Sequence, residues 1–421
     1  MLQARDAETL IFNLVHPLES QQDVEAVDLL AAAGRVLAVP VVSQLDFPHW
    51  DNSAMDGYAV RFADVASGSA EQPVSLTVVE EIPAGYAPQR TIESGQAARI
   101  LTGSMMPLGA DTVVMQEDTV RQGDRVLICT TPKPQAFVRH RGAYYQAGAA
   151  LLSPGVTLAA PEIAVLAAAQ CTAVRVYRRP RVAILSTGSE LVAPDQPLGP
   201  GQIVDSNQYA LAALVQQAGA EPICLGVVPD HPDALKQAIA QAISTADFVL
   251  SSGGVSVGDY DYVDQILAEL GASIHIRAVA VKPGKPLTVA TFTGGSRPRS
   301  VLYFGLPGNP VSALVTFWRF VLPALRKFSG LADSWGPVWT KGRSLHPLRS
   351  DGKRESYVWG QLHSVNGDYE FHMATGSHWS GNLINLACTN ALAMIPVGQT
   401  SIAAGDLVPI LQIGAPIVRA R

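Results

Sequence analysis

The chain has 421 residues, which at roughly 150 residues per domain is enough for about three domains, so a single small module is excluded. With 48% hydrophobic and 16% charged residues it is too apolar for a disordered chain. A formal net charge of −6 offers no bulk attraction to nucleic acid or to anionic lipid, and we expect neither as a partner. Any anion must therefore be recognised locally, by a few basic side chains at specific positions.

Three features favour a soluble protein of the cytoplasm. The four cysteines are widely spaced and form neither a zinc motif nor a dense disulfide framework. The most apolar stretch, residues 151–169, is interrupted by Pro154 and Pro161 and falls short of the roughly 20 clean residues of a membrane helix. The first ten residues lack the basic and apolar regions of a secretory signal.

Residues 5–18 repeat apolar side chains at helical spacing, and we expect a helix that Asp6 caps and Pro17 ends. From Val24 to about Tyr144, short β-type runs between Gly, Pro and Asp turns predict a β-rich layer. The alanine-rich stretch 151–175 predicts a helical return to the N-terminal segment.

Residues 181–328 alternate apolar runs with helix-like stretches, which is typical of an α/β domain with a largely parallel sheet. The last ~90 residues return to short strands and suggest a small C-terminal β domain, a barrel or a sandwich. The predicted fold class is therefore a multi-domain α/β plus β protein.

Five loops that follow the apolar runs of the α/β region carry unusual residues. Ligands of such sheets bind at the carboxyl ends of the strands, so these loops are the first candidates for a site. They contain Thr187–Glu190, Asp230, Gly253–Asp261, the lysine loop Lys282–Pro286, and Pro307–Pro310.

The residue types in these loops favour anions. Glycines let backbone N–H groups approach a phosphate, and Asn309 followed by Pro310 predicts a helix start. The carboxylates of Glu190, Asp230 and Asp261 are expected on the same edge. They would repel that phosphate unless a divalent cation such as Mg²⁺ lay between them. The two lysines of the lysine loop suit a second, compact oxyanion.

A second polar cluster, residues 51–60 with residues 101–103, lies in the β-rich section and could equally be a turn. GxSxG, the Walker phosphate loop and GxGxxG followed by a distant acid are absent, which weakens hydrolase, NTPase and dinucleotide-oxidoreductase interpretations.

Six segments together resemble the molybdopterin molybdenumtransferase family, the molybdenum insertases that include the E domain of gephyrin. In chain order they are DNSAMDGYAV (51–60), ILTGSMMPLGADTVVMQED (100–118), STGSEL (186–191), SSGGVSVGDYD (251–261), KPGKP (282–286) and GLPGNPVSAL (305–314). The resemblance implies an elongated homodimer of four-part subunits. The parts would be a discontinuous N-terminal and linking domain (1–45 and 145–178), an inserted β-rich domain (46–144), an α/β molybdopterin-binding domain (179–328) and a C-terminal β domain (329–421).

The reaction that the resemblance implies is Mg²⁺-dependent insertion of molybdate into adenylylated molybdopterin, with release of AMP. The implied partners are these two substrates and a second copy of the chain. Further candidate partners are the molybdopterin adenylyltransferase and acceptor molybdoenzymes.

Residue roles carried over from the family motifs are expectations. Catalytic roles fall to Asp261, Asp230, Glu190, Asp56 and Thr102, the last two approaching from the partner subunit. Of these, Asp261, Asp230 and Glu190 would position Mg²⁺ and the pyrophosphate. Molybdate would be held by Lys282, Lys285, Pro286, Arg354 and Ser377. The pterin phosphate and nucleotide would lie against Gly253, Gly254, Ser256, Gly308 and Asn309.

One departure from the family pattern concerns residues 138–145. Many members carry an acidic Gly-Glu-Asp run after a basic stretch, whereas here Arg141-Gly142 is followed by Ala143 and Tyr144. Two carboxylates are missing, so a non-catalytic molybdopterin-binding or scaffold paralogue remains an alternative. Adenylylation of molybdopterin is a third possibility, which the KPGKP segment and the extra β domains disfavour.

Overall fold

The computed structural model describes residues 1–253, 260–293 and 299–418, and for residues 260–262 it describes the backbone alone. Contacts within the chain divide it into two compact units. The first comprises Met1–Val39, Pro154–Ile163 and Ala173–Arg421, and the second comprises Pro40–Ser153 and Ala164–Thr172. The four-domain division stays a prediction.

The N-terminal helix α1 covers Ala4–Leu14 and is shorter than the sequence predicts. Asp6 lies in its first turn rather than at the cap, and the chain is already extended at Val15, two residues before Pro17. Val15 and Leu18 are buried in the core of the first unit, and the Leu18 N–H donates to the Phe328 carbonyl. Tertiary burial therefore ends the helix.

The stretch 151–175 is only partly helical, which corrects the prediction. Helix α3 covers Ala160–Ala168, and Gln170, with φ of 58°, terminates it. Strand β12 (Ala173–Tyr177) then pairs antiparallel with β1 (Val24–Asp28), which confirms a return to the N-terminal segment. The 3₁₀ turn η1 (Leu29–Ala32) follows β1.

The second unit is built on a six-stranded sheet in the order β7-β4-β6-β5-β9-β8. Apolar residues on its two faces form separate clusters, one around Val60 and Leu76 and the other around Ile82 and Ile100. Its strands are β4 (Gly57–Val60), β5 (Val74–Ile82), β6 (Gln96–Ile100), β7 (Thr112–Met115), β8 (Thr119–Gln122) and β9 (Arg125–Ile128). Its smaller elements are β2 (Val41–Val42) with β11 (Ala150–Leu152), β3 (Asn52–Ser53) with β10 (Val138–Arg139), α2 (Phe62–Val65) and η2 (Gln116–Asp118).

The α/β part of the first unit has a six-stranded sheet in the order β16-β13-β17-β21-β20-β18. The first four strands are parallel to one another, β20 runs antiparallel to its neighbours β21 and β18, and β18 therefore has the same direction as the first four. These strands are β13 (Arg181–Thr187), β16 (Glu221–Val228), β17 (Phe248–Ser252), β18 (Ala272–Ala278), β20 (Pro286–Phe292) and β21 (Val301–Leu306). A two-stranded ribbon, β14 (Leu191–Val192) with β15 (Ile203–Val204), follows β13.

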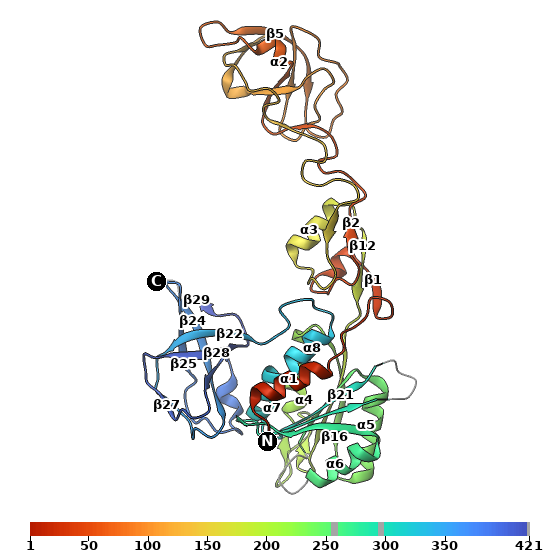
Figure 1. Ribbon diagram of the computed structural model, residues 1–421, viewed down its shortest axis with the longest axis vertical. Helices are drawn as coiled ribbons and strands as arrows, with labels where there is room; N and C mark the ends of the chain where they lie inside the picture. The colour runs from red at the N-terminus through yellow and green to blue at the C-terminus, as the bar shows by residue number, and fades with distance from the viewer. Residues whose placement is uncertain (254–259, 294–298, 419–421) are drawn as a thin grey trace. The chain divides into compact units, whose positions relative to one another are not determined.

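Successive side chains of the central strands serve two cores. Val182 and Ile184 face a core with helices α1, α4, α7 and α8, whereas Ala183 and Leu185 face α5 and α6 (Figure 1). The helices are α4 (Asn207–Gln217), α5 (Pro232–Thr245), α6 (Tyr260–Glu269), α7 (Pro310–Thr316) and α8 (Leu322–Phe328). Both faces of the sheet are thus covered, and ligands can reach only its edges.

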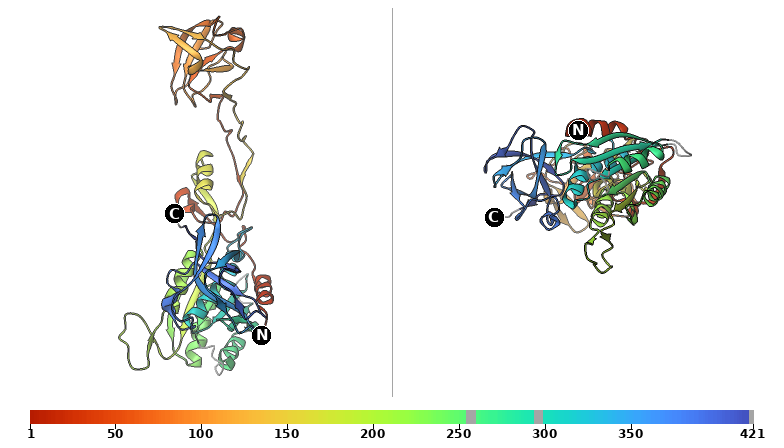
Figure 2. Two further views of the ribbon diagram at one scale, coloured as in Figure 1. Left: turned by 90° about the vertical axis from the view of Figure 1, so that its left-hand side faces the viewer. Right: turned by 90° about the horizontal axis from the view of Figure 1, so that it is seen from below.

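The C-terminal part contains a closed barrel, because β24 pairs with both β25 and β26 in the circular order β24-β25-β22-β28-β26 (Figure 2). Its strands are β22 (Val338–Ser344), β24 (Glu355–Val365), β25 (Asp368–Met373), β26 (Ala391–Ile395) and β28 (Leu407–Gln412). The smaller elements are β23 (Leu348–Arg349) with β27 (Ser401–Ile402), η4 (Leu383–Leu386) and β29 (Ile417–Val418). Strand β19 (Val281–Lys282) pairs with β24, so the lysine loop is attached to the barrel.

A buried arginine joins three parts of the first unit. Between α7 and α8 the chain forms a π-helical segment, η3 (Phe317–Val321), just before Pro323, whose ring disturbs the helical hydrogen bonds. Arg319 of η3 is 4% exposed and pairs with Glu8 of α1 at 2.6 Å and with Glu355 of β24 at 3.6 Å. Its Nε also donates to the Tyr357 hydroxyl at 2.8 Å.

No helix in the described part of the chain is long and apolar enough to cross a membrane.

Candidate active site

The topology brings the five predicted loops to one edge of the sheet. Strands β13, β16, β17 and β21 are parallel, so the loops that follow them leave the sheet on the same side. Strand β18 has the same direction as β21, because β20 is antiparallel to both. The lysine loop, which lies between β18 and β20, therefore belongs to this carboxyl edge as well.

Two glycines form the closest backbone approach at this edge. Gly253, with φ of +94°, has room for no side chain, because a Cβ there would lie 2.2 Å from the Thr187 carbonyl oxygen. A Cβ on Gly308 would lie 3.5 Å from the Cα of Gly253. Three loops thus converge with bare backbone, which is the arrangement that cradles a phosphate. We call Thr187, Gly253 and Gly308 the glycine cradle.

Asn207, at the start of α4, ties the cradle together. Its Nδ2 donates to the Ser252 Oγ at 2.6 Å and to the Gly308 carbonyl at 2.8 Å. Its Oδ1, like the Oγ1 of Thr187, is buried and has no hydrogen-bond partner among the described residues. Buried acceptors and hydroxyls without a partner at a strand edge fit a polar ligand. Our sequence prediction missed Asn207, although the polar run Asp205-Ser206-Asn207 directly before a helix is a recognisable signal.

The predicted helix start at Asn309 is confirmed, with Pro310 in the first turn of α7. The Asn309 side chain does not cap the helix; its Nδ2 donates to the Ser380 Oγ at 3.1 Å. The Val311 N–H also donates to the Ser380 carbonyl at 3.1 Å. Ser380, which precedes η4 in the barrel part, therefore closes over this loop, and the sequence analysis did not identify it.

Of the three predicted magnesium ligands, the structure describes the side chains of Glu190 and Asp230. The side chain of Glu190 points back toward its own loop: its Oε2 lies 2.7 Å from the position that a Cβ on Gly188 would take. Asp230 follows the neighbouring strand β16 and is exposed. Asp261 lies in the first turn of α6, where the structure describes backbone alone. Among the described side chains, no three His, Cys, Asp or Glu residues gather to hold a metal. Glu190 and Asp230 do supply the hard oxygen donors that Mg²⁺ prefers.

The lysine loop is shaped by a glycine. Gly284, with φ of +114°, packs against α7, and a Cβ there would lie 2.6 Å from the Thr316 Cγ2. Lys282 and Lys285 are both exposed on either side of this anchored turn, and Pro286 begins β20. The loop therefore presents two ammonium groups from a fixed backbone.

Arg354 joins the lysine loop through strand pairing. The Glu355 N–H donates to the Ala280 carbonyl at 3.0 Å, and the Arg354 Nη1 lies 3.4 Å from the Val281 carbonyl oxygen. A carboxylate that we did not predict lies with them: the Asp351 Oδ2 is 3.2 Å from the Lys282 Nζ and 3.8 Å from the Arg354 Nη2. The pKa of Asp351 is lowered by the Lys353 N–H and then by Lys282.

Ser377 is exposed in the loop that leads to Ser380. Its carbonyl accepts from Asn382 at 3.0 Å and from Asn385 at 2.8 Å, so the loop is internally braced. No hydrogen bond between Ser377 and the lysine loop or Arg354 is present among the residues the structure describes. Gly254 and Ser256 lie outside the described residues.

In the second unit, Asp56 and Thr102 meet. Asp56 Oδ1 accepts from both the backbone N–H and the hydroxyl of Thr102, each at 2.7 Å. Both side chains belong to an exposed surface, and these bonds hold the pKa of Asp56 below its usual value. The family motifs predict a role for both residues, and the structure brings them into contact.

The segment with the missing acidic run lies beside two other carboxylates. The Arg141 Nε donates to Asp46 at 2.7 Å, its backbone N–H donates to Asp51 at 2.7 Å, and the His140 Nδ1 lies 3.2 Å from Asp51. Tyr144 is 62% exposed. His140 and Arg141 are therefore paired with carboxylates from 89 to 95 residues earlier in the chain.

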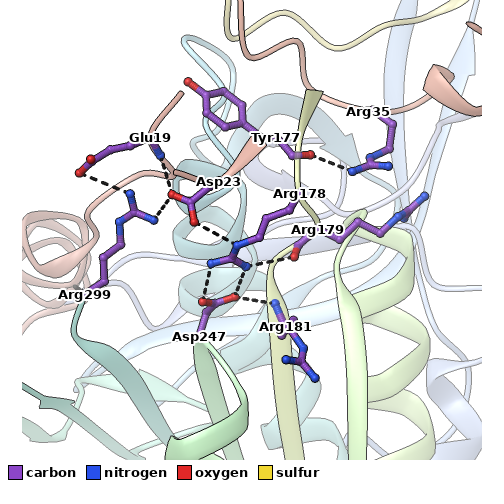
Figure 3. A network of polar contacts seen from close by, with 9 residues as sticks. All are labelled: Glu19, Asp23, Arg35, Tyr177, Arg178, Arg179, Arg181, Asp247 and Arg299. Atoms are coloured by element: carbon purple, nitrogen blue, oxygen red, sulfur yellow. Dashed lines mark hydrogen bonds and ion pairs between the residues drawn. The ribbon is translucent and has the colours of Figure 1, made fainter. Parts of the chain in front are cut away.

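A cavity of about 360 Å³ lies at the opposite edge, where strands β13, β17 and β21 begin. Figure 3 shows its charged network: Arg178 donates to both oxygens of Asp247 and to Asp23, and Asp23 also pairs with Arg299. Because these cations are matched by carboxylates, we interpret the network as a structural joint. It anchors the ends of the β1/β12 pair to the sheet.

The glycine cradle and the basic cluster, which we define as Lys282, Lys285 and Arg354, lie at one edge of an α/β sheet. This arrangement is typical of the class of α/β proteins that bind anionic ligands at the carboxyl ends of their strands. Three family models match this chain. They are the MoeA N-terminal region (domain I and II) over residues 2–169, the probable molybdopterin binding domain over residues 183–327, and the MoeA C-terminal region (domain IV) over residues 341–413.

Known proteins resemble the chain over three quarters of its length or more. A molybdopterin molybdenumtransferase from Nostoc sp. is 66% identical over 98% of this chain and 94% of that protein. One from Haemophilus influenzae is 37% identical over 75% of this chain and 76% of that protein. The crystal structure of a molybdopterin biosynthesis protein from Pyrococcus horikoshii OT3 has a TM-score of 0.82 at 30% identity and covers 98% of this chain and 100% of that chain. This chain belongs to the molybdopterin molybdenumtransferase family, whose members are transferases of molybdenum cofactor biosynthesis.

Proposed function

We propose that this protein inserts molybdate into adenylylated molybdopterin and releases AMP in a Mg²⁺-dependent reaction. The observation that carries the proposal is one sheet edge with both closely approaching backbone and exposed cations. The glycine cradle suits the phosphates of an adenylylated ligand, and Lys282, Lys285 and Arg354 suit a small oxyanion.

In this proposal the chain's own groups bind and orient the substrates. Gly253 and Gly308 admit the pyrophosphate close to backbone, and Asn207 keeps their loops together. Glu190, Asp230 and Asp261 would hold Mg²⁺, which would neutralise the phosphate charge. The cations of the lysine loop, together with Arg354, Pro286 and Ser377, would orient molybdate.

The active unit that we propose is a homodimer in the cytoplasm, in which Asp56 and Thr102 serve the partner's site. Their mutual hydrogen bonds leave the second oxygen of the Asp56 carboxylate for another contact. All four cysteines are free thiols, as suits a reducing compartment.

The test is AMP release by purified full-length protein given adenylylated molybdopterin, Mg²⁺ and molybdate. Lys285→Ala should lose the dependence on molybdate, and Lys341→Ala, an exposed lysine on the barrel strand β22, is the matched control. Absence of AMP release under these conditions contradicts the proposal.

The departure at Tyr144 gives the experiment a second discriminating outcome. Binding of adenylylated molybdopterin without AMP release would favour the non-catalytic paralogue. ATP consumption with bare molybdopterin would favour an adenylyltransferase. Tyr144→Asp restores one of the two missing carboxylates. AMP release that appears only in this variant would show that wild type lacks a catalytic acid, and no release would favour the non-catalytic paralogue.

A further inference from the structure

The carboxylate of Asp351 occupies the basic cluster that would bind the oxyanion. One oxygen, Oδ2, is 3.2 Å from the Lys282 Nζ and 3.8 Å from the Arg354 Nη2. These are two of the three cations assigned to that anion, and Lys285 has no side-chain partner among the described residues.

Asp351 is held in place by its own turn rather than by the cations alone. Its other oxygen, Oδ1, accepts from the Lys353 N–H at 3.0 Å. The turn is tied down at Gly352, whose N–H donates to the Ser350 Oγ at 3.1 Å and whose carbonyl accepts from the Gly398 N–H at 2.8 Å. The carboxylate therefore faces Lys282 because of the local backbone.

An incoming oxyanion needs the same donors. A carboxylate oxygen and an oxygen of a tetrahedral dianion cannot both occupy hydrogen-bonding distance of one ammonium group without mutual repulsion. The side chains of Lys282 and Asp351 are 50% and 34% exposed, so water screens this repulsion but does not abolish it.

We propose that Asp351 is a built-in competitor for the oxyanion, whose carboxylate must leave Lys282 and Arg354 before molybdate binds. It lowers the affinity of the site and makes release easier. The inference rests on the oxyanion site of the proposed function, and it adds a residue that sets the site's strength.

The test is equilibrium binding of sodium molybdate to the full-length protein, measured by calorimetry without the pterin substrate. Asp351→Asn keeps the acceptor for the Lys353 N–H and removes the charge, and we expect it to tighten binding about five- to thirtyfold. Asp351→Glu should show no such gain. Asp368→Asn, an exposed carboxylate at the start of β25, controls for net charge. Thermal unfolding of each variant verifies folding.

A double-mutant cycle with Lys282→Ala tests whether Asp351 competes with molybdate through this ammonium group. The gain from Asp351→Asn should shrink in the Lys282→Ala background, because the carboxylate acts through that ammonium. Unchanged or weaker binding in Asp351→Asn, with binding still lost in Lys285→Ala, overturns the competitor and leaves the oxyanion site intact. If wild type and all variants bind no molybdate, both the proposed oxyanion site and the competitor role of Asp351 are contradicted.

Discussion

The carboxylate of Asp56 accepts two hydrogen bonds from Thr102, one from the backbone N–H and one from the hydroxyl, each 2.7 Å long. The two residues are 46 positions apart, and strand β4, which follows Asp56, pairs with β6, which ends just before Thr102. Sheet register therefore builds this contact, and it orients a carboxylate on an exposed surface.

Thr102→Val should raise the pKa of Asp56 toward 3.8, because the hydroxyl is the foremost cause of its lowering. The backbone N–H remains, so the rise is partial. Carboxyl ¹³C NMR titration measures the shift, and Thr91→Val, at an exposed residue in the same unit, is the control. An unchanged Asp56 titration in Thr102→Val would show that the hydroxyl does not stabilise the carboxylate.

Gly253→Ala should weaken ligand binding in the glycine cradle and lower turnover. The new Cβ would lie 2.2 Å from the Thr187 carbonyl oxygen, so one of the two loops must move. Displacement of this size lowers turnover by about a hundredfold. AMP release and binding of adenylylated molybdopterin measure the loss.

The matched control for this change is Gly271→Ala. Gly271 also has a positive φ, +83°, but nothing lies within 4 Å of its would-be Cβ. It carries the backbone strain, about 1–2 kcal/mol, without the collision. Equal activity losses in the two variants would attribute the effect to strain and not to the cradle.

Asn207→Ala should loosen the cradle without touching its backbone. It removes the hydrogen bonds to Ser252 and Gly308, which costs about 1–3 kcal/mol of unfolding free energy. We expect KM for adenylylated molybdopterin to rise about tenfold, since 1.4 kcal/mol corresponds to that factor. Steady-state kinetics and urea unfolding measure the two effects. The exposed Asn13→Ala on α1 should change neither, and an unaltered KM in Asn207→Ala would contradict a positioning role.

Asp23→Asn should destabilise the joint of Figure 3. Burial raises the pKa of Asp23, but the Glu19 N–H, Arg299 and Arg178 outweigh it, so the folded-state pKa lies below 3.8. A depressed carboxyl pKa contributes stability that is complete above the unfolded value and is lost as pH falls through the folded value.

The variant should therefore lose about 1–3 kcal/mol of unfolding free energy at neutral pH, with the difference from wild type shrinking below about pH 4. Urea unfolding at several pH values measures it, and Asp195→Asn, an exposed loop carboxylate, is the control. A difference that stays constant down to acid pH would assign the loss to packing instead of charge.

Much of the fold was predictable because local patterns coincide with tertiary roles. Strands β5 (74–82) and β16 (221–228) lie in the sections 24–144 and 181–328, where short apolar runs predicted strands. The loops after the strands could be assigned to one edge, since parallel strands share the direction of their ends. Helix α1 was predicted too long, because burial of Val15 and Leu18 outweighs helical periodicity.

The sequence by itself determined the family and the fold class of the protein, and it assigned the five candidate loops to one edge of the sheet, because each of these is carried by short contiguous motifs. Only the tertiary structure decided that Asn207 bridges two loops, that Ser380 reaches Asn309, and that Asp351 faces Lys282. Those partners are 69 to 101 residues apart. They meet through strand pairing and barrel closure, which depend on hydrogen bonds between distant segments and leave no periodic trace in either segment alone.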